Sequence, residues 1–184
     1  EQQARLLDAK LKVMEHAPAP GQPLDPAAML EPLAQVLGAD TASILTVDEF
    51  PDGPRLVAKL RWLRSPDLPV IAPQEGLPVA AVQAWFDRLV SQQALLAEFT
   101  PDGPAPAAQL HARGHRTFLA AALLGSKGIP GALYFSSIGR SRPWGDAELG
   151  AVRSYAALLA GMFARDAAVE GMRAQERRAT EVAS

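Results

Sequence analysis

The chain has 184 residues, of which 48% are apolar and 21% charged, and a net charge of -2 at neutral pH. This length fits one globular domain with helical extensions, and the charge gives no electrostatic reason to expect a nucleic-acid partner. The sequence contains no cysteine, which excludes disulfides, thiolate metal sites and cysteine nucleophiles.

No window reaches the ~20 apolar residues of a membrane helix, and the charged, amphipathic N-terminus is unlike a signal peptide. The chain does not begin with methionine. We therefore expect a cytoplasmic piece of a longer protein, with no membrane contact in this segment.

Residues 1–16 are predicted to form a helix because one apolar stripe recurs at helical spacing. The stripe consists of Leu7, Leu11 and Met14. The proline- and glycine-rich segment 17–23 ends this helix. A second helix is predicted from Pro26, with Asp25 as its cap and Gly38 as its end. Its buried face is formed by Met29, Leu30, Leu33, Val36 and Leu37.

Two strands are predicted at 42–48 and 55–62, joined by a turn at 51–54. The second strand alternates, which places Leu56, Ala58, Leu60 and Trp62 on one face. One face of these strands then meets a core while the other is partly hydrated, as in an antiparallel sheet.

The middle of the chain alternates between helical and extended patterns. In order, we predict a crossover at 66–78, a helix at 79–91, a strand at 94–99, a helix at 105–113, and strands at 117–124 and 131–136 around a turn at Lys127 and Gly128. The helix at 79–91 carries Val82, Trp85, Phe86 and Leu89. The alanines at 120–122 indicate either a roomy cavity or close helix packing.

The last helix is predicted to start near Asp146 and to run almost to the C-terminus, over roughly 50–55 Å. From Leu149 to Phe163 it is apolar nearly all round, whereas beyond Arg165 only a narrow seam of Val169 and Met172 persists. We expect the first half to pack on the sheet and the second half to project toward a partner helix.

These pieces, in this order, resemble the GAF sensory domain of bacterial signalling proteins. The resemblance runs from about Leu24 to Arg165 and is carried by the segments GADTASILTVDE, AVQAWFDRLV, HARGHRTFLAAALLGSKGIPGALYFSS and PWGDAELGAVRSYAALLAGMFAR. It is closest to the GAF domains that precede outputs in sensor histidine kinases, diguanylate cyclases, phosphodiesterases and transcription regulators. It implies an α+β, profilin-like and PAS-related fold, in which long terminal helices flank an antiparallel sheet of five or six strands.

The resemblance also implies a division of the chain and of its two faces. Residues 1–16 form a signalling helix, 24–165 the GAF domain, and 166–184 a helix leading to an absent output domain. Helices on one side of the sheet form a ligand pocket, and the first and last helices pair with a second subunit on the other side. The signature of cyclic-nucleotide-binding GAF domains is not recognisable, and without cysteine neither thioether attachment of a bilin nor methionine-sulfoxide reductase activity is possible.

Five aromatic residues are candidates for ligand contact, because small-molecule sites are mostly apolar with a few polar groups. They are Trp62, Trp85, Phe86, Phe118 and Tyr134. The alternative is that they are simply core residues.

Other polar groups give weaker signals of chemistry. His111 and His115 lie four residues apart, as two metal ligands on a helix would, but Gly114 interrupts the segment and helix-end polar residues are the plainer interpretation. The acidic group Asp48, Glu49 and Asp52 lies beside a turn, where aspartate ordinarily bonds to the backbone. Ser136, Ser137 and Ser141 have no histidine at motif spacing, so a hydrolase is not expected. We expect Arg140 and Arg142 to lie in a solvated basic loop, and Trp144 to fix the last helix to the sheet.

We therefore expect a non-enzymatic, homodimeric sensory module that binds an unknown small molecule, with no metal and no evident cofactor. The ligand would shift the domain between two states, and the terminal helices would carry that shift to an output domain. Candidate transmission residues are Leu7, Leu11, Met14, Tyr155, Leu158, Met162, Val169 and Met172. Two alternatives remain open: a ligand-free dimerisation scaffold, and a haem-based gas sensor with one histidine on the iron.

Overall fold

The computed structural model describes residues 1–183 apart from 20, 24, 70–75 and 126–127. The elements follow in the order α1 (Gln2–Glu15), α2 (Pro26–Leu37), β1 (Thr41–Phe50), β2 (Gly53–Leu63), β3 (Leu77–Pro78), the 3-10 helix η1 (Val79–Val82), α3 (Gln83–Gln92), β4 (Ala94–Glu98), α4 (Ala105–Ala112), β5 (His115–Gly125), β6 (Gly128–Ile138) and α5 (Asp146–Ala183). The predicted turn at Lys127 and part of the predicted crossover at 66–78 lie outside the described residues. The two-residue strand β3 was not predicted.

The strands form one sheet in the order β3-β2-β1-β6-β5-β4, and every neighbouring pair is antiparallel. The predicted α+β class with a flanked antiparallel sheet is therefore confirmed, with six strands. Within the described ranges, no helix is both long and apolar enough to span a lipid bilayer.

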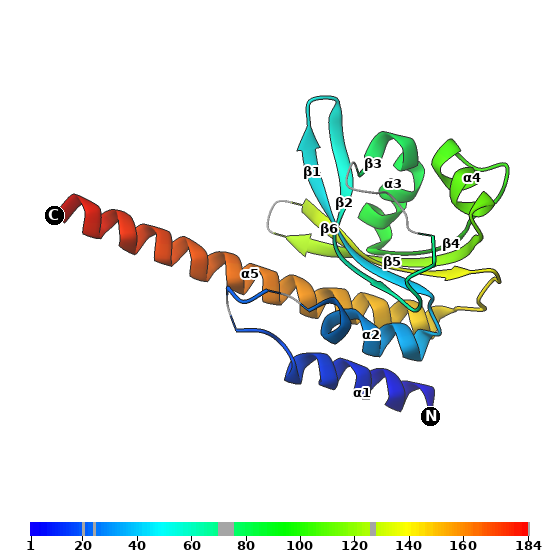
Figure 1. Ribbon diagram of the computed structural model, residues 1–184, viewed down its shortest axis with the longest axis horizontal. Coiled ribbons are helices and arrows are strands. Elements are labelled where there is room, and N and C mark those ends of the chain that lie inside the picture. The colour runs from blue at the N-terminus through cyan, green and yellow to red at the C-terminus, as the bar shows by residue number, and fades with distance from the viewer. Residues whose placement is uncertain (20, 24, 70–75, 126–127, 184) are drawn as a thin grey trace.

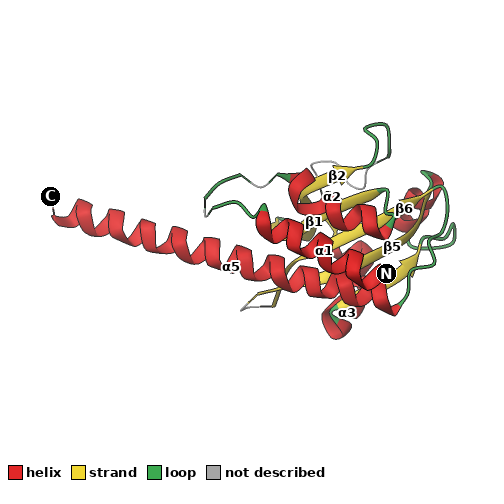
Figure 2. Ribbon diagram, turned by 90° about the horizontal axis from the view of Figure 1, so that it is seen from below, coloured by secondary structure: helices red, strands yellow, loops and turns green. Residues whose placement is uncertain are grey.

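Helices cover both faces of the sheet in separate layers. The helices α3 and α4 lie on one face, while α2 and the first half of α5 lie on the other, with α1 packed outside them (Figure 1). Figure 2 shows α1, α2 and α5 side by side over that second face. The two sides bury two separate apolar clusters, the larger one beneath α2 and α5 and the smaller one beneath α3 and α4.

The helix α2 begins and ends where its sequence predicts. The Asp25 carboxylate accepts a hydrogen bond from the Ala27 amide at 3.1 Å, and Pro26 opens the helix. Gly38 ends it with φ of 62°, a left-handed conformation that glycine adopts without a steric penalty. Trp144 donates from its indole nitrogen to the Leu37 carbonyl at 2.8 Å, so the predicted anchor ties the segment before α5 to the end of α2.

The helix α5 is divided in two, as its sequence predicts. In its first half Val152, Tyr155, Ala156 and Leu159 are buried, and the Tyr155 hydroxyl donates to the Met29 carbonyl of α2. The second half extends away from the domain as a single exposed helix (Figure 1). The C-terminal half of α5 therefore projects beyond the sheet and its helical layers (Figure 1).

The predicted alternation of β2 is wrong because the strand contains a β-bulge. Ile44 of β1 pairs with Leu60, but the next residue, Leu45, pairs with Ala58, so Lys59 is an extra residue in β2. An extra residue reverses which face the following side chains occupy. Leu56 therefore faces α3, whereas Leu60 and Trp62 pack against the cluster beneath α2.

Candidate functional site

A cavity of about 70 Å³ lies between the sheet and the layer formed by η1, α3 and α4. Its walls come from every strand of the sheet and from all three helices, and none of the residues that line it carries a charge. The cavity has room because two neighbouring strands carry alanines there, Ala120 in β5 and Ala132 in β6. Small side chains at these positions leave the space that larger ones would fill.

The alanines at 120–122 in β5 leave room for a cavity and also permit close helix packing, the two alternatives that the sequence indicated. Ala120 and Ala122 belong to the cluster beneath α3 and α4, and Ala120 lines the cavity. Ala121 points to the opposite side, where it belongs to the cluster beneath α5. The strand therefore leaves room on one face and permits close helix packing on the other.

Aromatic rings in edge and stacked contacts form one wall of the cavity. The ring of Phe118 lies 5.0 Å from that of Trp85, 5.0 Å from that of Phe99 and 5.5 Å from that of Tyr134, measured between centroids. Trp85 also meets Phe99 edge-on at 5.7 Å. Such contacts hold aromatic rings in defined orientations, so this wall has a fixed shape.

Four of the five predicted ligand-contact residues are brought together at this cavity. Trp85, Phe86, Phe118 and Tyr134 line it, whereas Trp62 lies on the other face of the sheet because of the bulge at Lys59. Their ligand-binding roles stay predictions. Sequence reasoning missed Phe99, which directly follows β4 and lines the cavity together with Leu95. The two residues are four apart, so an extended chain places them on the same face, and this spacing is visible in the sequence.

The Tyr134 hydroxyl is the buried polar group of this wall. Tyr134 is 7% exposed, and its oxygen lies beside the Ser136 hydroxyl. Burial raises the pKa of this phenol far above its ordinary value, and the nearby Ser136 hydroxyl offsets only part of that effect. The Ser136 oxygen is already engaged by Thr41 at 2.5 Å and by His115 at 3.2 Å. The phenol is therefore neutral at physiological pH.

The two histidines spaced four residues apart do not form a ligand pair. His111 lies near the end of α4, whereas His115 begins β5 and is completely buried. Both ring nitrogens of His115 have partners: Nδ1 lies 3.2 Å from the Ser136 hydroxyl, and Nε2 lies 3.2 Å from the Pro69 carbonyl. The expectation of helix-end polar residues is therefore wrong for His115, which is part of a buried polar network at the end of the sheet.

His115 is expected to make the stability of the protein fall in acid. Burial lowers its pKa from 6.5 to about 4, although the Pro69 carbonyl works in the opposite direction. A lowered pKa means that the folded state resists protonation, so the stabilisation is complete above pH 6.5 and is lost as the pH falls toward 4. Between about pH 7.5 and about pH 4.5, urea unfolding of the wild type should lose about 2 kcal/mol more than that of His115→Gln. Parallel losses in both proteins would contradict this assignment.

The acidic residues near the first turn form ordinary ion pairs. Asp48 accepts from Lys59 at 2.7 Å and Asp52 from Arg55 at 2.5 Å, and the Lys59 hydrogen bond lowers the pKa of Asp48. Glu49 is exposed on the same strand. Across the residues described, no three His, Asp or Glu side chains are grouped so that they could hold a metal ion.

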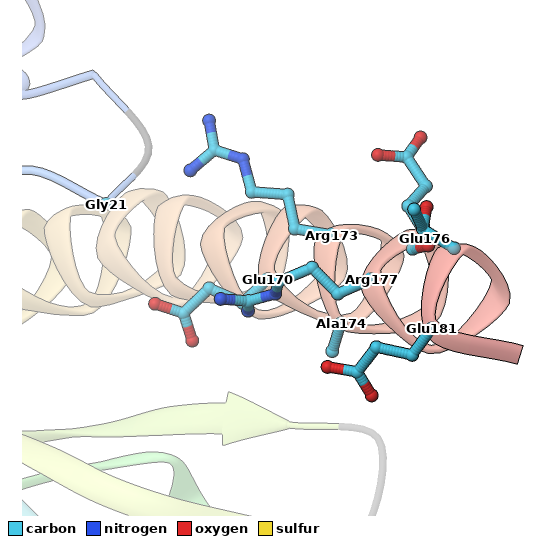
Figure 3. A pocket seen from close by; sticks show the side chains of 8 residues that line it. Gly21, Glu170, Arg173, Ala174, Glu176, Arg177 and Glu181 are labelled. Atoms are coloured by element: carbon cyan, nitrogen blue, oxygen red, sulfur yellow. Dashed lines mark hydrogen bonds between the residues drawn. The ribbon is translucent and has the colours of Figure 1, made fainter. Parts of the chain in front are cut away.

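A much larger hollow, about 990 Å³, lies along the second half of α5 beside Gly21. Figure 3 shows its side chains pointing in different directions from one exposed helix, with Arg173 and Glu176 on one side and Glu181 on another. A ligand there would touch exposed charged side chains on one side only, and ligand sites are normally concave and largely apolar. This hollow is an open surface, and the small cavity is the better candidate despite its size.

The predicted transmission residues fall into two groups. Leu7, Leu11 and Met14 of α1 and Met172 of α5 are exposed, because α1 instead packs on α2 through Ala9 and Val13. Tyr155 is buried within the protomer, and Leu158, Met162 and Val169 are half-buried. Their role in signalling remains a prediction.

Comparison with known proteins supports the fold assignment. The chain superimposes on the phycocyanobilin-bound GAF domain of a cyanobacterial phytochrome with a TM-score of 0.61 and 18% identity, over 90% of this chain and 95% of that one. The chromophore-binding domain of a bacteriophytochrome from R. palustris gives 0.71 and 8%, over 92% and 64%. A GAF domain/HD domain protein from Geobacter sulfurreducens gives 0.60 and 14%, over 90% and 97%.

At these identities the structural likeness establishes the fold alone. A search of curated protein sequences gave no significant match. The family model described as "GAF domain", however, matches residues 27–162, most of the chain. On this match, together with the six-stranded antiparallel sheet and its two helical layers, the chain belongs to the GAF domain family.

Proposed function

We propose that the chain is a sensory GAF domain that binds a small molecule in the cavity beneath α3 and transmits the binding event through its terminal helices. The observation that carries the proposal is the uncharged cavity, which has an aromatic wall and has Ala120 and Ala132 at its base. One of the structural relatives named above is a GAF domain with a bound phycocyanobilin, which supports a ligand role for this fold. No feature of the described residues suggests catalysis in this segment.

We expect a ligand that is not a thioether-linked bilin. The chain has no cysteine for a thioether, and the cavity of about 70 Å³ is far below the ~300–1,000 Å³ typical of ligand sites. The haem hypothesis gains no support either, because no histidine lines the cavity and His115 already uses both nitrogens. A small ligand fits better, in a cavity that expands when it binds.

Filling the cavity tests this proposal. With a panel of small ring compounds at about ten times their Kd, the melting temperature of the wild type should rise by about 3 °C. Ala132→Val narrows the cavity and should abolish the rise, while Ala84→Val, on the exposed side of α3, should retain it. If no compound raises the melting temperature of the wild type, the scaffold hypothesis replaces the sensor. An equal rise in all three proteins would place the ligand elsewhere.

We also propose that two copies of the chain pair through α1 and α5. The apolar stripe of Leu7, Leu11 and Met14 is about half exposed, at 58%, 49% and 51%, and solvent-facing apolar stripes on helices are typical of helix–helix interfaces. It lies on the sheet face opposite the cavity (Figure 1). A second copy is the partner that can cover the same stripe symmetrically.

A second feature of α5 supports this pairing. Exposed small residues recur at alternating spacings of four and three along the helix: Gly150, Ser154, Ala157, Gly161, Ala164, Ala168 and Gly171. A side-chain carbon added at any of the three glycines would meet nothing within 4 Å, so the protomer itself gives no steric reason for glycine. Because glycine costs about 1 kcal/mol in a helix interior, its use here favours close approach of another helix backbone.

Sedimentation equilibrium over a micromolar concentration series tests the pairing. The wild type should form a dimer, and Leu11→Glu and Ala164→Glu should each weaken it by about tenfold or more, because a charge is then buried at the seam. Val90→Glu, at a similarly exposed apolar position on α3, should leave the dimer unchanged. A wild type that stays monomeric, or a dimer indifferent to both charges, would contradict the proposal.

A further inference from the structure

A groove of about 430 Å³ lies on the other face of the sheet, between the strands and the middle of α5. Its base is deeply buried, because Ile44 of β1 and Leu123 of β5 are each 2% exposed and belong to the cluster beneath α2 and α5. Its helical side is formed by Ala160, Phe163 and Ala164. Unlike the cavity beneath α3, this α5 groove has a volume within the ~300–1,000 Å³ of small-molecule sites.

The two polar side chains of the α5 groove lie together. Among the described residues that line it, Lys59 is the only charged one, and Thr46 contributes a hydroxyl. Both are held by one carboxylate, because Asp48 accepts a hydrogen bond from Lys59 at 2.7 Å and another from Thr46 at 2.7 Å. Mostly apolar walls with a few positioned polar groups are the usual composition of a small-molecule site.

The ion pair at the groove limits the charge that a ligand can carry. An anionic head group at Lys59 would also face the Asp48 carboxylate, and a cationic one would face the Lys59 ammonium. An uncharged oxygen avoids both repulsions. Because an ammonium group has three donors, Lys59 can donate to such an oxygen while it keeps its bond to Asp48. The apolar walls favour an alkyl body for the rest of the ligand.

The position of the α5 groove connects it to the helix that leaves the domain. The buried residues of α5 end at Leu159, and the helix then projects away from the sheet (Figure 1). A ligand between Leu123 and Phe163 would touch the sheet and the helix where the two separate. It would therefore favour one direction of the projecting half over another, which is what a signalling ligand must do.

We propose that the α5 groove binds an uncharged amphiphile, with its alkyl body between Leu123 and Phe163 and its oxygen at Lys59. This second site lies on the sheet face opposite the cavity beneath α3, and it stands whether or not that cavity binds a ligand. Ala164 lies both in the groove and in the seam of small residues on α5. A second copy of the chain is therefore the competing occupant.

Three eight-carbon probes that differ in their head group test the site: 1-octanol, octanoate and octylammonium. Amide NMR titration of the full chain should give a Kd for 1-octanol of about 1 mM or below, with shifts at Leu123, Leu124 and Phe163. Ala160→Leu, which fills the groove, should weaken this binding by about tenfold. Ala167→Leu, at an exposed position two turns further along α5, should leave it unchanged.

The ratio of the octanoate and octylammonium constants tests where the head group lies, because the shared alkyl chain cancels from it. Asp48→Asn leaves Lys59 without its counter-charge and should shift the ratio toward octanoate by about fivefold. Lys59→Gln should shift it toward octylammonium by a similar factor. A ratio unchanged in both variants would show that the head group lies elsewhere, which overturns the proposal.

The remaining outcomes separate this inference from the proposals above. Shifts confined to Phe118, Ala120 and Tyr134 would place the alkyl chain beneath α3, so that this inference fails while the proposed function stands. Binding to the Leu11→Glu variant but not to the wild type would assign the groove to the second copy. Absence of binding to both proteins would show that the groove is no site for amphiphiles. Either of these last two results overturns the proposal.

Discussion

Replacing Gly131 with alanine is expected to destabilise the protein by about 3 kcal/mol or more, an effect at the upper end for single substitutions. Gly131 lies in β6, between Thr46 of β1 and Leu123 of β5. A side-chain carbon at this position would stand 2.0 Å from the Leu45 carbonyl oxygen and 3.1 Å from its carbon. Both are backbone atoms, so the clash is relieved only if β1 and β6 move apart.

Urea unfolding measures this loss, and Gly139→Ala is the matched control. Gly139 has φ of 82° and open space around it, so alanine there should cost only the left-handed backbone penalty of about 1–2 kcal/mol. Equal losses for the two variants would mean that the close approach at Gly131 has no special cost. That result would contradict the pairing register of β1 and β6.

Replacing Trp144 with alanine is expected to cost about 4 kcal/mol. The side chain is 8% exposed and belongs to the cluster beneath α2 and α5. Its indole also satisfies the Leu37 carbonyl at the end of α2, which would be left without this donor. The residue therefore joins two helices that are adjacent in space but distant in sequence.

A matched variant divides this effect into its two parts. Trp144→Phe keeps most of the apolar contact and removes the donor, so it should cost about 1–2 kcal/mol. Chemical denaturation of the three proteins supplies the comparison. A phenylalanine variant as unstable as the alanine variant would assign the whole effect to the hydrogen bond, and an alanine variant within about 0.5 kcal/mol of the wild type would refute the anchoring role.

Local sequence signals were sufficient wherever one residue determines the backbone. Asp25, Pro26 and Gly38 bound α2 as predicted, because capping and left-handed termination depend on those residues alone. The last helix likewise begins at Asp146. The antiparallel order of the strands agreed with the resemblance to the family and with the alternating patterns.

The sequence could not reveal features that depend on partners distant in the chain. The bulge at Lys59 arises from the register between β1 and β2, and it moved Trp62 away from the cavity. In α1 the apolar periodicity found the exposed stripe, but the helix docks through Ala9 and Val13, of which Ala9 is too small to register as a strong apolar position.

The location of the candidate site could be predicted from the sequence, but the environment of its polar groups could not. Aromatic residues on the helix at 79–91 and on the strands β5 and β6 indicated the correct face, and four of the five named residues line the cavity. The burial of the Tyr134 hydroxyl depends on what surrounds it in three dimensions. The buried His115 network likewise requires β5, β6 and the Pro69 carbonyl to meet.

The central claim is that the cavity beneath α3 is the sensing site, and amide NMR spectra with and without a stabilising ring compound test it most directly. The account predicts the largest shifts at Phe99, Phe118, Ala120 and Tyr134, which surround the cavity, with smaller changes reaching the first half of α5 across the sheet. Shifts confined to the exposed half of α5, around Arg173 and Arg177, would contradict it, because they would place the ligand on the open surface there.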